Sequence, residues 1–119
     1  MNHATRFAKL TADAKSRVRE VSARDASEQQ ASGAVLIDVR ESEEFSQGHA
    51  KGAVHLSKGV LELRIEDAIP DAATPIICYC GGGARSALAA DNLQKMGYTN
   101  VASMAGGLKG WKNEGLPIA

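Results

Sequence analysis

The sequence predicts an α/β domain in which a small parallel sheet is flanked by helices. Short apolar runs such as residues 34–39 are nearly continuous, as in strands that are covered on both faces. These runs alternate with stretches whose apolar residues recur at helical spacing, which favours parallel strands joined by right-handed crossovers. The length of 119 residues suits one domain with a single core.

The first predicted element is an amphipathic helix at residues 5–19. Its apolar residues recur at helical spacing: Phe7, Leu10, Ala14 and Val18. Residues 1–24 contain six basic and two acidic residues, a net charge of +4, which leaves −4 for residues 25–119. Because amphipathic helices usually bury their apolar face, we expect this helix to pack on its own domain or across a homodimer. The alternative is a basic arm that docks on a partner protein.

The middle of the chain is predicted to alternate helices and strands. Ser22 and Ser42 each have the side chain of a helix N-cap, and Gly33 and Gly48 end the helices that follow them. In chain order the predicted elements are a helix at residues 22–31, a strand at 34–39, a helix at 43–47, a strand at 53–56 and a helical region around 61–65.

The C-terminal part begins with a strand at residues 75–80, whose proline stands at its first position, where a missing N–H is tolerated. A glycine turn leads into a strong helix at residues 84–96, which Gly97 ends. The residues that we expect on its buried face are Leu88, Ala89, Leu93 and Met96. A last strand at residues 100–104 precedes a short helix anchored by Trp111.

Composition excludes several classes of protein. The chain has 14 basic and 14 acidic residues, so its neutral balance offers no electrostatic footprint for nucleic acid. No apolar run approaches the roughly 20 residues of a membrane-spanning helix, and the N-terminus lacks the apolar region of a secretory signal. Two cysteines cannot build a disulfide framework, so we expect a reducing, cytoplasmic location.

One segment combines the features of an anion-binding nest. Cys80 ends a buried strand, three glycines turn the chain, and a helix begins with Arg85 in its first turn. Glycines allow successive N–H groups to point into one concavity, and a helix N-terminus adds partial positive charge. Such a nest should lower the pKa of Cys80 and make it a nucleophile without a histidine base. Cys78 lies inside the strand and is interpreted as core packing.

Other polar residues give weaker signals. Asp38 and Arg40 follow the strand at residues 34–39 and reach the same edge of the sheet, where they either support the site or form a structural ion pair with Glu41 or Glu44. A cation in the first turn of a helix opposes the helix dipole, so Arg85 calls for an anionic partner. Neither His49 nor His55 has the spacing of a metal ligand or of a catalytic triad, and no metal or cofactor is expected.

Taken together, these segments make the chain resemble a single-domain rhodanese over about residues 18–119. The segment Val35–Glu41, continued through Gly48–Ala53, is similar to the first signature of that family. Cys80–Ser86 has the form C-x-x-G-x-R-S of its active-site loop, and Gly106–Trp111 with the later Gly-Leu-Pro is similar to its C-terminal signature. The resemblance implies a three-layer fold for one rhodanese-like domain at residues 21–119, which the basic amphipathic helix inferred above, residues 1–20, precedes.

The resemblance also implies sulfurtransferase activity. Cys80 would accept a sulfane sulfur from a small donor such as thiosulfate, become a persulfide, and pass the sulfur to cyanide, a thiol or a protein acceptor. The backbone amides that would cradle the sulfur belong to Gly81, Gly82, Gly83, Ala84, Arg85 and Ser86. Arg85 would be the only side-chain cation of the loop available to a thiosulfate sulfonate.

Three other functions remain as alternatives. A persulfide carrier or protein-binding module would use the same cysteine with little turnover of its own. Oxidant or arsenate reduction would need Cys78 as a resolving thiol, although a Cys-x-Cys disulfide within a strand is strained. A phosphatase is disfavoured because related phosphatases have five residues between cysteine and arginine, whereas four separate Cys80 from Arg85.

Overall fold

The computed structural model describes residues 5–119 and confirms the predicted α/β class with a parallel sheet. One sheet contains five strands in the order β1-β5-β4-β2-β3, and every neighbouring pair is parallel. The strands are β1 (Arg19–Val21), β2 (Val35–Asp38), β3 (Val54–His55), β4 (Ile76–Tyr79) and β5 (Val101–Met104). All but β1 lie within strands predicted from the sequence.

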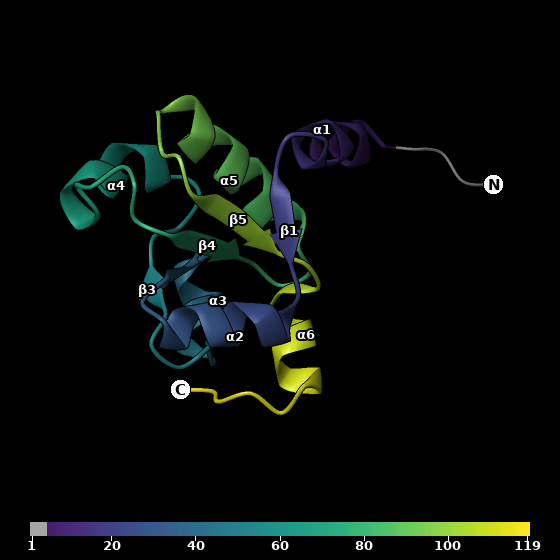
Figure 1. Cartoon of the computed structure of the whole chain (residues 1–119). Coiled ribbons are helices and arrows are strands. Elements are labelled where there is room, and N and C mark those ends of the chain that lie inside the picture. Colours follow the sequence, from purple (N-terminus) through teal and green to yellow (C-terminus); the bar gives the residue numbers. More distant parts are fainter. Residues whose placement is uncertain (1–4) are drawn as a thin grey trace.

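Helices cover both faces of the sheet and give the molecule three layers (Figure 1). The helices are α1 (Arg6–Lys15), α2 (Ala23–Ala31), α3 (Ser42–Ser46), α4 (Leu61–Ala68), α5 (Ala84–Lys95) and α6 (Gly107–Asn113). One face packs against α4 and α5, and the opposite face packs against α2 and α6. Helix α1 lies beside α5 at the outside of the first layer.

The alternation of side chains along β4 explains why the sheet needs both layers. Ile76 and Cys78 belong to the core on the α5 side, whereas Ile77 and Tyr79 belong to the core on the α6 side. All four residues are buried, so the strand has no solvated face and its sequence has no polar alternation. The same alternation places Cys80, the next residue, on the α5 side.

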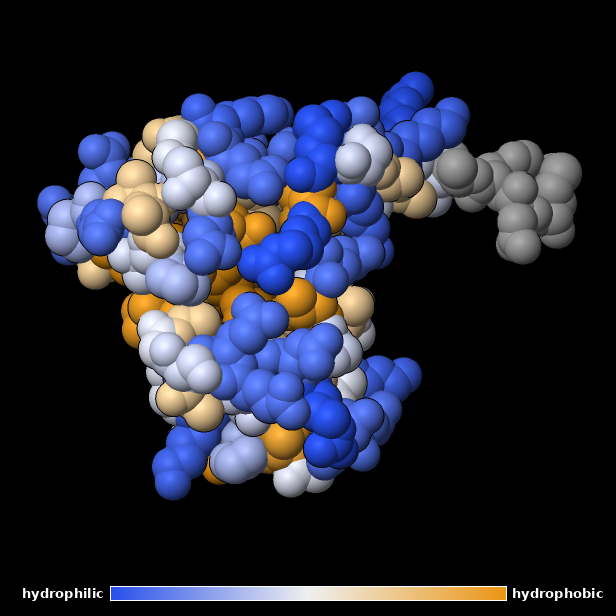
Figure 2. Space-filling view, in the orientation of Figure 1, coloured by the Kyte–Doolittle hydropathy of each residue, from blue (hydrophilic) through white to orange (hydrophobic). Residues whose placement is uncertain are grey.

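Hydrophilic residues cover the outer surfaces of both helix layers in the view of Figure 2, and the apolar residues visible there lie mainly along the sheet between the layers. Within residues 5–119, no helix has the length and apolar character needed to cross a membrane.

The N-terminal segment differs from its prediction. The helix ends at Lys15 instead of continuing to residue 19, and Arg19–Val21 forms strand β1, which pairs with β5. Two of its three residues are exposed, so this short edge strand lacks the continuous apolar run that marks the other strands. The predicted domain boundary at residue 20 falls inside β1, and residues 1–4 of the predicted segment lie outside the described residues.

The predicted apolar face of this helix is only partly buried. Ala14 and Val18 pack into the domain, but Phe7 and Leu10 are 51% and 55% exposed. The C-terminal part of the segment therefore packs on the domain, whereas Phe7 and Leu10 are exposed in the single chain and packing across a homodimer stays a prediction for them. The C-terminal part of α1 lies next to α5, and Arg17 in the segment that follows forms an ion pair with Asp91 of α5.

Two details of other helices also differ. Glu41, and not Ser42, is the N-cap of α3, and its N–H donates to Glu44 Oε1 at 3.1 Å. Met96, the C-cap residue of α5, is exposed and Leu88 is half-buried, because the face of α5 against the sheet consists mainly of small residues. The residues of α5 that are buried are Ser86, Ala87, Ala89, Ala90, Asp91 and Leu93.

Candidate active site

The carboxyl ends of β2, β3, β4 and β5 meet at one edge of the sheet because the strands are parallel. Asp38 ends β2, and Cys80 follows β4 directly. Gly81–Gly83 then turn the chain into α5, whose N-cap is Gly83 in the left-handed conformation, with φ of 109°. The predicted strand, turn and helix are thus confirmed in the order that the nest requires.

The Cys80 sulfur lies inside a ring of hydrogen-bond donors. Gly83 N–H donates to Cys80 Sγ at 3.1 Å, and Ser86 N–H donates to it at 3.4 Å. The Cys80 thiol donates to Ser86 Oγ at 3.5 Å, and the Ser86 hydroxyl becomes the donor of this contact when the sulfur is a thiolate. Cys80 is only 1% exposed, so these groups replace the water that would otherwise solvate a thiolate.

This environment determines the ionisation of Cys80. Burial by itself raises the pKa of a thiol, because a charged sulfur loses its solvation. Hydrogen bonds from the Ser86 hydroxyl and from the N–H groups of Ser86, Gly83 and Gly82 outweigh burial, and the pKa of Cys80 is lowered. Within the described residues, the N–H groups of Gly81, Ala84 and Arg85 make no hydrogen bond to this sulfur.

Ser103 is a site residue that the sequence did not reveal. It lies in β5, is fully buried, and its Oγ is 2.8 Å from Ser86 Oγ. The pairing of β4 with β5 places Ser103 opposite Cys78, which is two residues before Cys80 and on the same side of the sheet. A lone serine in a predicted strand carries no signal of function, and only the strand order brings it to the site.

Gly106 and Gly107, at the start of α6, allow the last helix to lie directly on the loop that follows Cys80. Leu108 N–H donates to Cys80 O at 2.8 Å, and Lys109 N–H donates to Gly81 O at 3.3 Å. Gly107 has φ of 55°, and a Cβ on it would overlap the carbonyl groups of Cys80 and Gly81. The segment Gly106–Trp111 therefore packs against the backbone of the loop that follows Cys80 and supports it.

Arg85 does not extend freely into the site. Its Nη1 and Nη2 donate to Glu44 Oε1 and Oε2 at 2.7 and 3.0 Å, in a bidentate pair between α5 and α3. Hydrogen bonding from Arg85 lowers the pKa of Glu44 to about 2. The pKa of Arg85 is raised, first by Glu44 and to a smaller extent by the Cys80 thiolate.

Asp38 and Arg40 form a buried ion pair with each other, and neither pairs with Glu41 or Glu44. Arg40 donates to both carboxylate oxygens of Asp38, with the shortest distance at 2.7 Å. Tyr79 Oη also donates to Asp38 at 2.7 Å and accepts from Ala50 N–H at 3.0 Å. This network holds the residue that precedes Cys80 and, through Arg40 and Gly48 O, the loop after α3.

Cys78 has the opposite environment from Cys80. It is completely buried in the core on the α5 side, and burial raises its pKa to about 12. His49 and His55 both stack on Phe45, and each hydrogen-bonds a backbone carbonyl oxygen. Among the described residues, no group of three or more His, Cys, Asp or Glu side chains could hold a metal ion.

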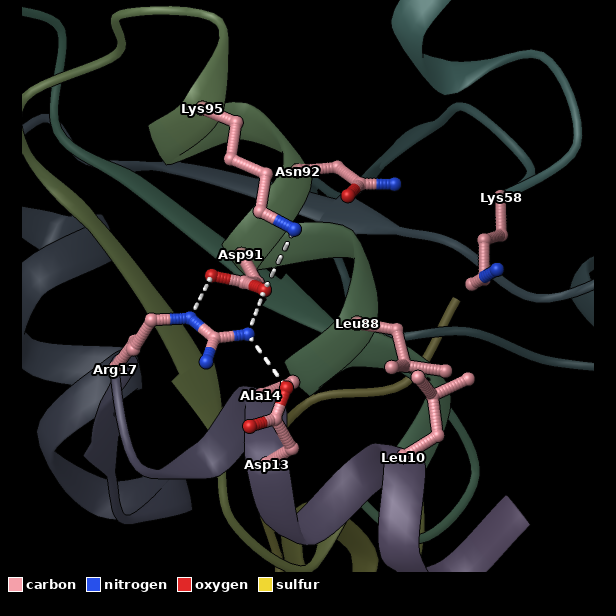
Figure 3. Close-up of a pocket in the computed structure, with 9 residues that line it drawn as sticks. All are labelled: Leu10, Asp13, Ala14, Arg17, Lys58, Leu88, Asp91, Asn92 and Lys95. Atoms are coloured by element: carbon pink, nitrogen blue, oxygen red, sulfur yellow. Dashed lines mark hydrogen bonds and ion pairs between the residues drawn. The ribbon is translucent and has the colours of Figure 1, made fainter. Parts of the chain in front are cut away.

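A separate hollow of about 180 Å³ lies between α1 and α5, away from Cys80 (Figure 3). Arg17 donates to both oxygens of Asp91, at 3.1 and 2.7 Å, and to Asp13 at 2.9 Å. The Lys95 ammonium is 3.4 Å from Asp91. Because these charges are paired with one another, the arrangement attaches α1 to the domain and offers no set of convergent groups for a ligand.

The sequence matches the rhodanese-like domain family over residues 22–114. Thiosulfate sulfurtransferase GlpE of Haemophilus influenzae is 39% identical over 100 residues, which cover 84% of this chain and 93% of the relative. Thiosulfate sulfurtransferase PspE of Escherichia coli is 41% identical over 73 residues, covering 61% and 69% of the two chains.

Two solved structures extend the similarity to almost the whole chain. The polysulfide-sulfur transferase homodimer of Wolinella succinogenes has a TM-score of 0.81 at 31% identity, covering 95% of this chain and 86% of its own. A Rhodopseudomonas palustris protein of unknown function, described as a possible tyrosine phosphatase, has a TM-score of 0.88 at 28% identity. This match covers 100% of this chain and 98% of the other.

Proposed function

The chain belongs to the rhodanese-like domain family, and from this membership we propose that it is a sulfurtransferase that works through a persulfide on Cys80. The donor is a small molecule with a sulfane sulfur, such as thiosulfate, and the acceptor is cyanide or a thiol. Relatives named thiosulfate sulfurtransferase and polysulfide-sulfur transferase support this class of reaction.

The observation that carries the proposal is the ring of donors around the Cys80 sulfur. Two backbone N–H groups and one hydroxyl lie within 3.5 Å of Sγ. They lower the pKa of the thiol and so raise the fraction of thiolate without a basic side chain. The same donors suit a persulfide, whose terminal sulfur also carries negative charge.

The first half-reaction moves sulfur from the donor to the enzyme. The Cys80 thiolate attacks the sulfane sulfur of thiosulfate and forms a new S–S bond. The bond between the two sulfurs of thiosulfate breaks, and its electron pair leaves with sulfite. The products are a Cys80 persulfide anion and sulfite, so charge and atoms balance.

The second half-reaction restores the enzyme. Cyanide attacks the terminal sulfur of the persulfide, the S–S bond breaks, and its electrons return to Cys80 as thiolate while thiocyanate leaves. A covalent intermediate divides one transfer into two steps, so ping-pong kinetics are expected. Gly83 and the start of α6 hold the loop through their hydrogen bonds to Cys80, and the N–H groups around its sulfur therefore stay in place during both steps.

Mass spectrometry of the intact protein after incubation with thiosulfate tests the proposal. We expect one added sulfur atom on the wild type and on Cys78→Ala, and none on Cys80→Ser. Subsequent cyanide should remove the adduct and release thiocyanate. Absence of the adduct with thiosulfate, inorganic polysulfide and a thiol persulfide, or full turnover by Cys80→Ser, would disprove it.

A phosphatase activity is the second candidate, because one structural relative is described as a possible tyrosine phosphatase. Four residues separate Cys80 from Arg85, and the Arg85 guanidinium is held by Glu44. A short loop with an occupied arginine suits one sulfur atom better than a phosphate. Hydrolysis of p-nitrophenyl phosphate by the wild type at rates comparable to sulfur transfer would reverse this ranking.

Assembly, partners and location complete the proposal. The homodimeric relative and the exposure of Phe7 and Leu10 support a second copy as the partner of α1. Light scattering of wild type and of Leu10→Glu should then give dimer and monomer. The two unpaired cysteines support a reducing, cytoplasmic compartment.

A persulfide carrier that docks on a protein acceptor through α1 is the alternative. Deletion of residues 1–15, which leaves β1 intact, distinguishes the two. Unchanged thermal unfolding with lost transfer to a protein acceptor indicates docking, whereas lower stability with normal transfer to cyanide indicates packing.

A further inference from the structure

Arg85, the cation beside the proposed catalytic loop, is paired with Glu44. Both terminal nitrogens of Arg85 donate to Glu44, at 2.7 and 3.0 Å. Arg85 Nη2 also lies over Gly81, 3.3 Å from the position that a Cβ would take there. The guanidinium thus lies beside the turn that follows Cys80, but its two terminal nitrogens already have an anionic partner.

The charges at this edge make the consequence clear. The Cys80 thiolate and Glu44 each carry one negative charge, and Arg85 carries one positive charge. Asp38 and Arg40 neutralise each other in the interior. Thiosulfate carries two negative charges and would meet a net negative group of side chains, whereas a thiol persulfide carries at most one and has no oxyanion that needs Arg85.

We propose that Glu44 is a specificity-determining residue that competes with the oxyanion of a donor for Arg85. It thereby disfavours thiosulfate and favours donors that present a sulfane sulfur without an oxyanion, the thiol persulfides R–S–SH. This inference rests on the proposed sulfurtransferase function and names the donor class for the same site.

Transfer from a thiol persulfide needs no cation for its leaving group. The Cys80 thiolate attacks the terminal sulfur of R–S–SH, the S–S bond of the donor breaks, and its electron pair leaves with the thiolate R–S⁻. Cys80 becomes the persulfide Cys80–S–SH, and one negative charge is present before and after. The hydrogen-bond donors around Cys80 Sγ bind the transferred sulfur whether it comes from thiosulfate or from a thiol persulfide.

The variant Glu44→Gln tests the inference in the full-length protein. Glutamine keeps the shape of the side chain and an oxygen that can accept from Glu41 N–H, but it lacks the charge. With thiosulfate and cyanide, we expect kcat/KM to rise about fivefold through a lower KM, the scale of one partly exposed ion pair. The gain should shrink at high ionic strength, because salt screens exposed charges.

Two controls separate competition from a general effect of charge. Glu43→Gln removes the same charge from an exposed position on the same helix and should leave KM for thiosulfate unchanged. With the persulfide of 2-mercaptoethanol, which has no oxyanion, kcat/KM of Glu44→Gln should stay within twofold of the wild type.

An unchanged or higher KM for thiosulfate in an active Glu44→Gln protein would overturn the inference, since Glu44 would then merely position Arg85. An equal gain in Glu43→Gln would overturn it as well. These results differ from failure of the proposed function, in which the wild type forms no Cys80 persulfide with either donor.

Discussion

Two cysteines that lie two residues apart have opposite chemistry in this protein. Cys78 is inside β4 and surrounded by apolar side chains, so burial raises its pKa to about 12. Cys80 is equally inaccessible, yet its sulfur faces the N–H groups at the start of α5. The ionisation of each thiol therefore follows from the hydrogen-bond donors around its sulfur and not from its exposure.

Substitution of Ser103 tests the outer part of this environment. Ser103→Ala removes the hydroxyl that lies 2.8 Å from Ser86 Oγ and leaves Ser86 free to turn away from Cys80. We expect the pKa of Cys80 to rise, and the rate of alkylation by iodoacetamide at pH 7 to fall about fivefold, the effect of one hydrogen bond. The pH profile of alkylation measures the change directly.

Ser103→Thr is the matched control, because it retains the hydroxyl and should restore the alkylation profile. Urea unfolding of both variants reports any loss of stability separately. A Ser103→Ala protein with the wild-type pH profile would show that Ser103 only fills space.

At the scale of elements, α6 makes a close contact with the loop that follows Cys80. Gly107→Ala would force a Cβ into the carbonyl groups of Cys80 and Gly81 and displace the start of α6. We expect a loss of at least about 2 kcal/mol in the free energy of unfolding, which combines overlap with backbone strain. Persulfide formation should also fall, since the loop loses the hydrogen bond from Leu108.

Gly115→Ala provides the comparison for backbone strain alone. Gly115 also has a positive φ, of 70°, but nothing lies within 4 Å of an added Cβ. It should cost only about 1 kcal/mol and leave activity intact. Equal effects of the two substitutions on urea unfolding would contradict the role assigned to the contact.

The attachment of α1 is also a property of elements. Arg17 joins the segment after α1 to Asp91, whose side chain is 7% exposed, whereas Arg24 joins Glu114 at the surface. Within residues 5–119, Arg17→Ala leaves the largely buried Asp91 carboxylate with Lys95 as its one ion-pair partner and should cost about 1 kcal/mol of stability. Arg24→Ala should change stability by less than about 0.5 kcal/mol. Thermal unfolding of the two variants compares them, and a larger effect of Arg24→Ala would be contrary to expectation.

At the scale of the whole molecule, ion pairs between elements make stability depend on acid pH. Arginine partners lower the pKa of Glu44 to about 2 and lower the pKa values of Asp91 and Asp13. A carboxyl whose pKa is lower in the folded state stabilises the fold above its unfolded value, and this contribution is lost as pH falls through the folded value. For Glu44 the window runs from 4.5 down to about 2.

Urea unfolding at a series of pH values should therefore show declining stability across that window. Glu44→Gln should reduce the decline, because glutamine does not titrate. The same slope in wild type and variant would mean that the pair with Arg85 contributes nothing in solution.

The sequence by itself determined the α/β class, most of the elements and the place of Cys80, the candidate nucleophile, between a strand and a helix. These features are local: apolar runs, helical periodicity and a glycine turn after Cys80 each lie within a few consecutive residues. The sequence did not reveal β1, since its three residues form a strand only because β5 lies beside them.

The tertiary structure alone decided which side chains meet. Ser86 and Ser103 come together through the pairing of β4 with β5, and Arg85 meets Glu44 across 41 positions of chain. Short-range patterns are encoded in neighbouring residues, whereas these contacts arise from strand order and helix packing. That is why Cys80 was evident from its own segment, and why the groups that orient the loop and neutralise its arginine became evident only in the folded chain.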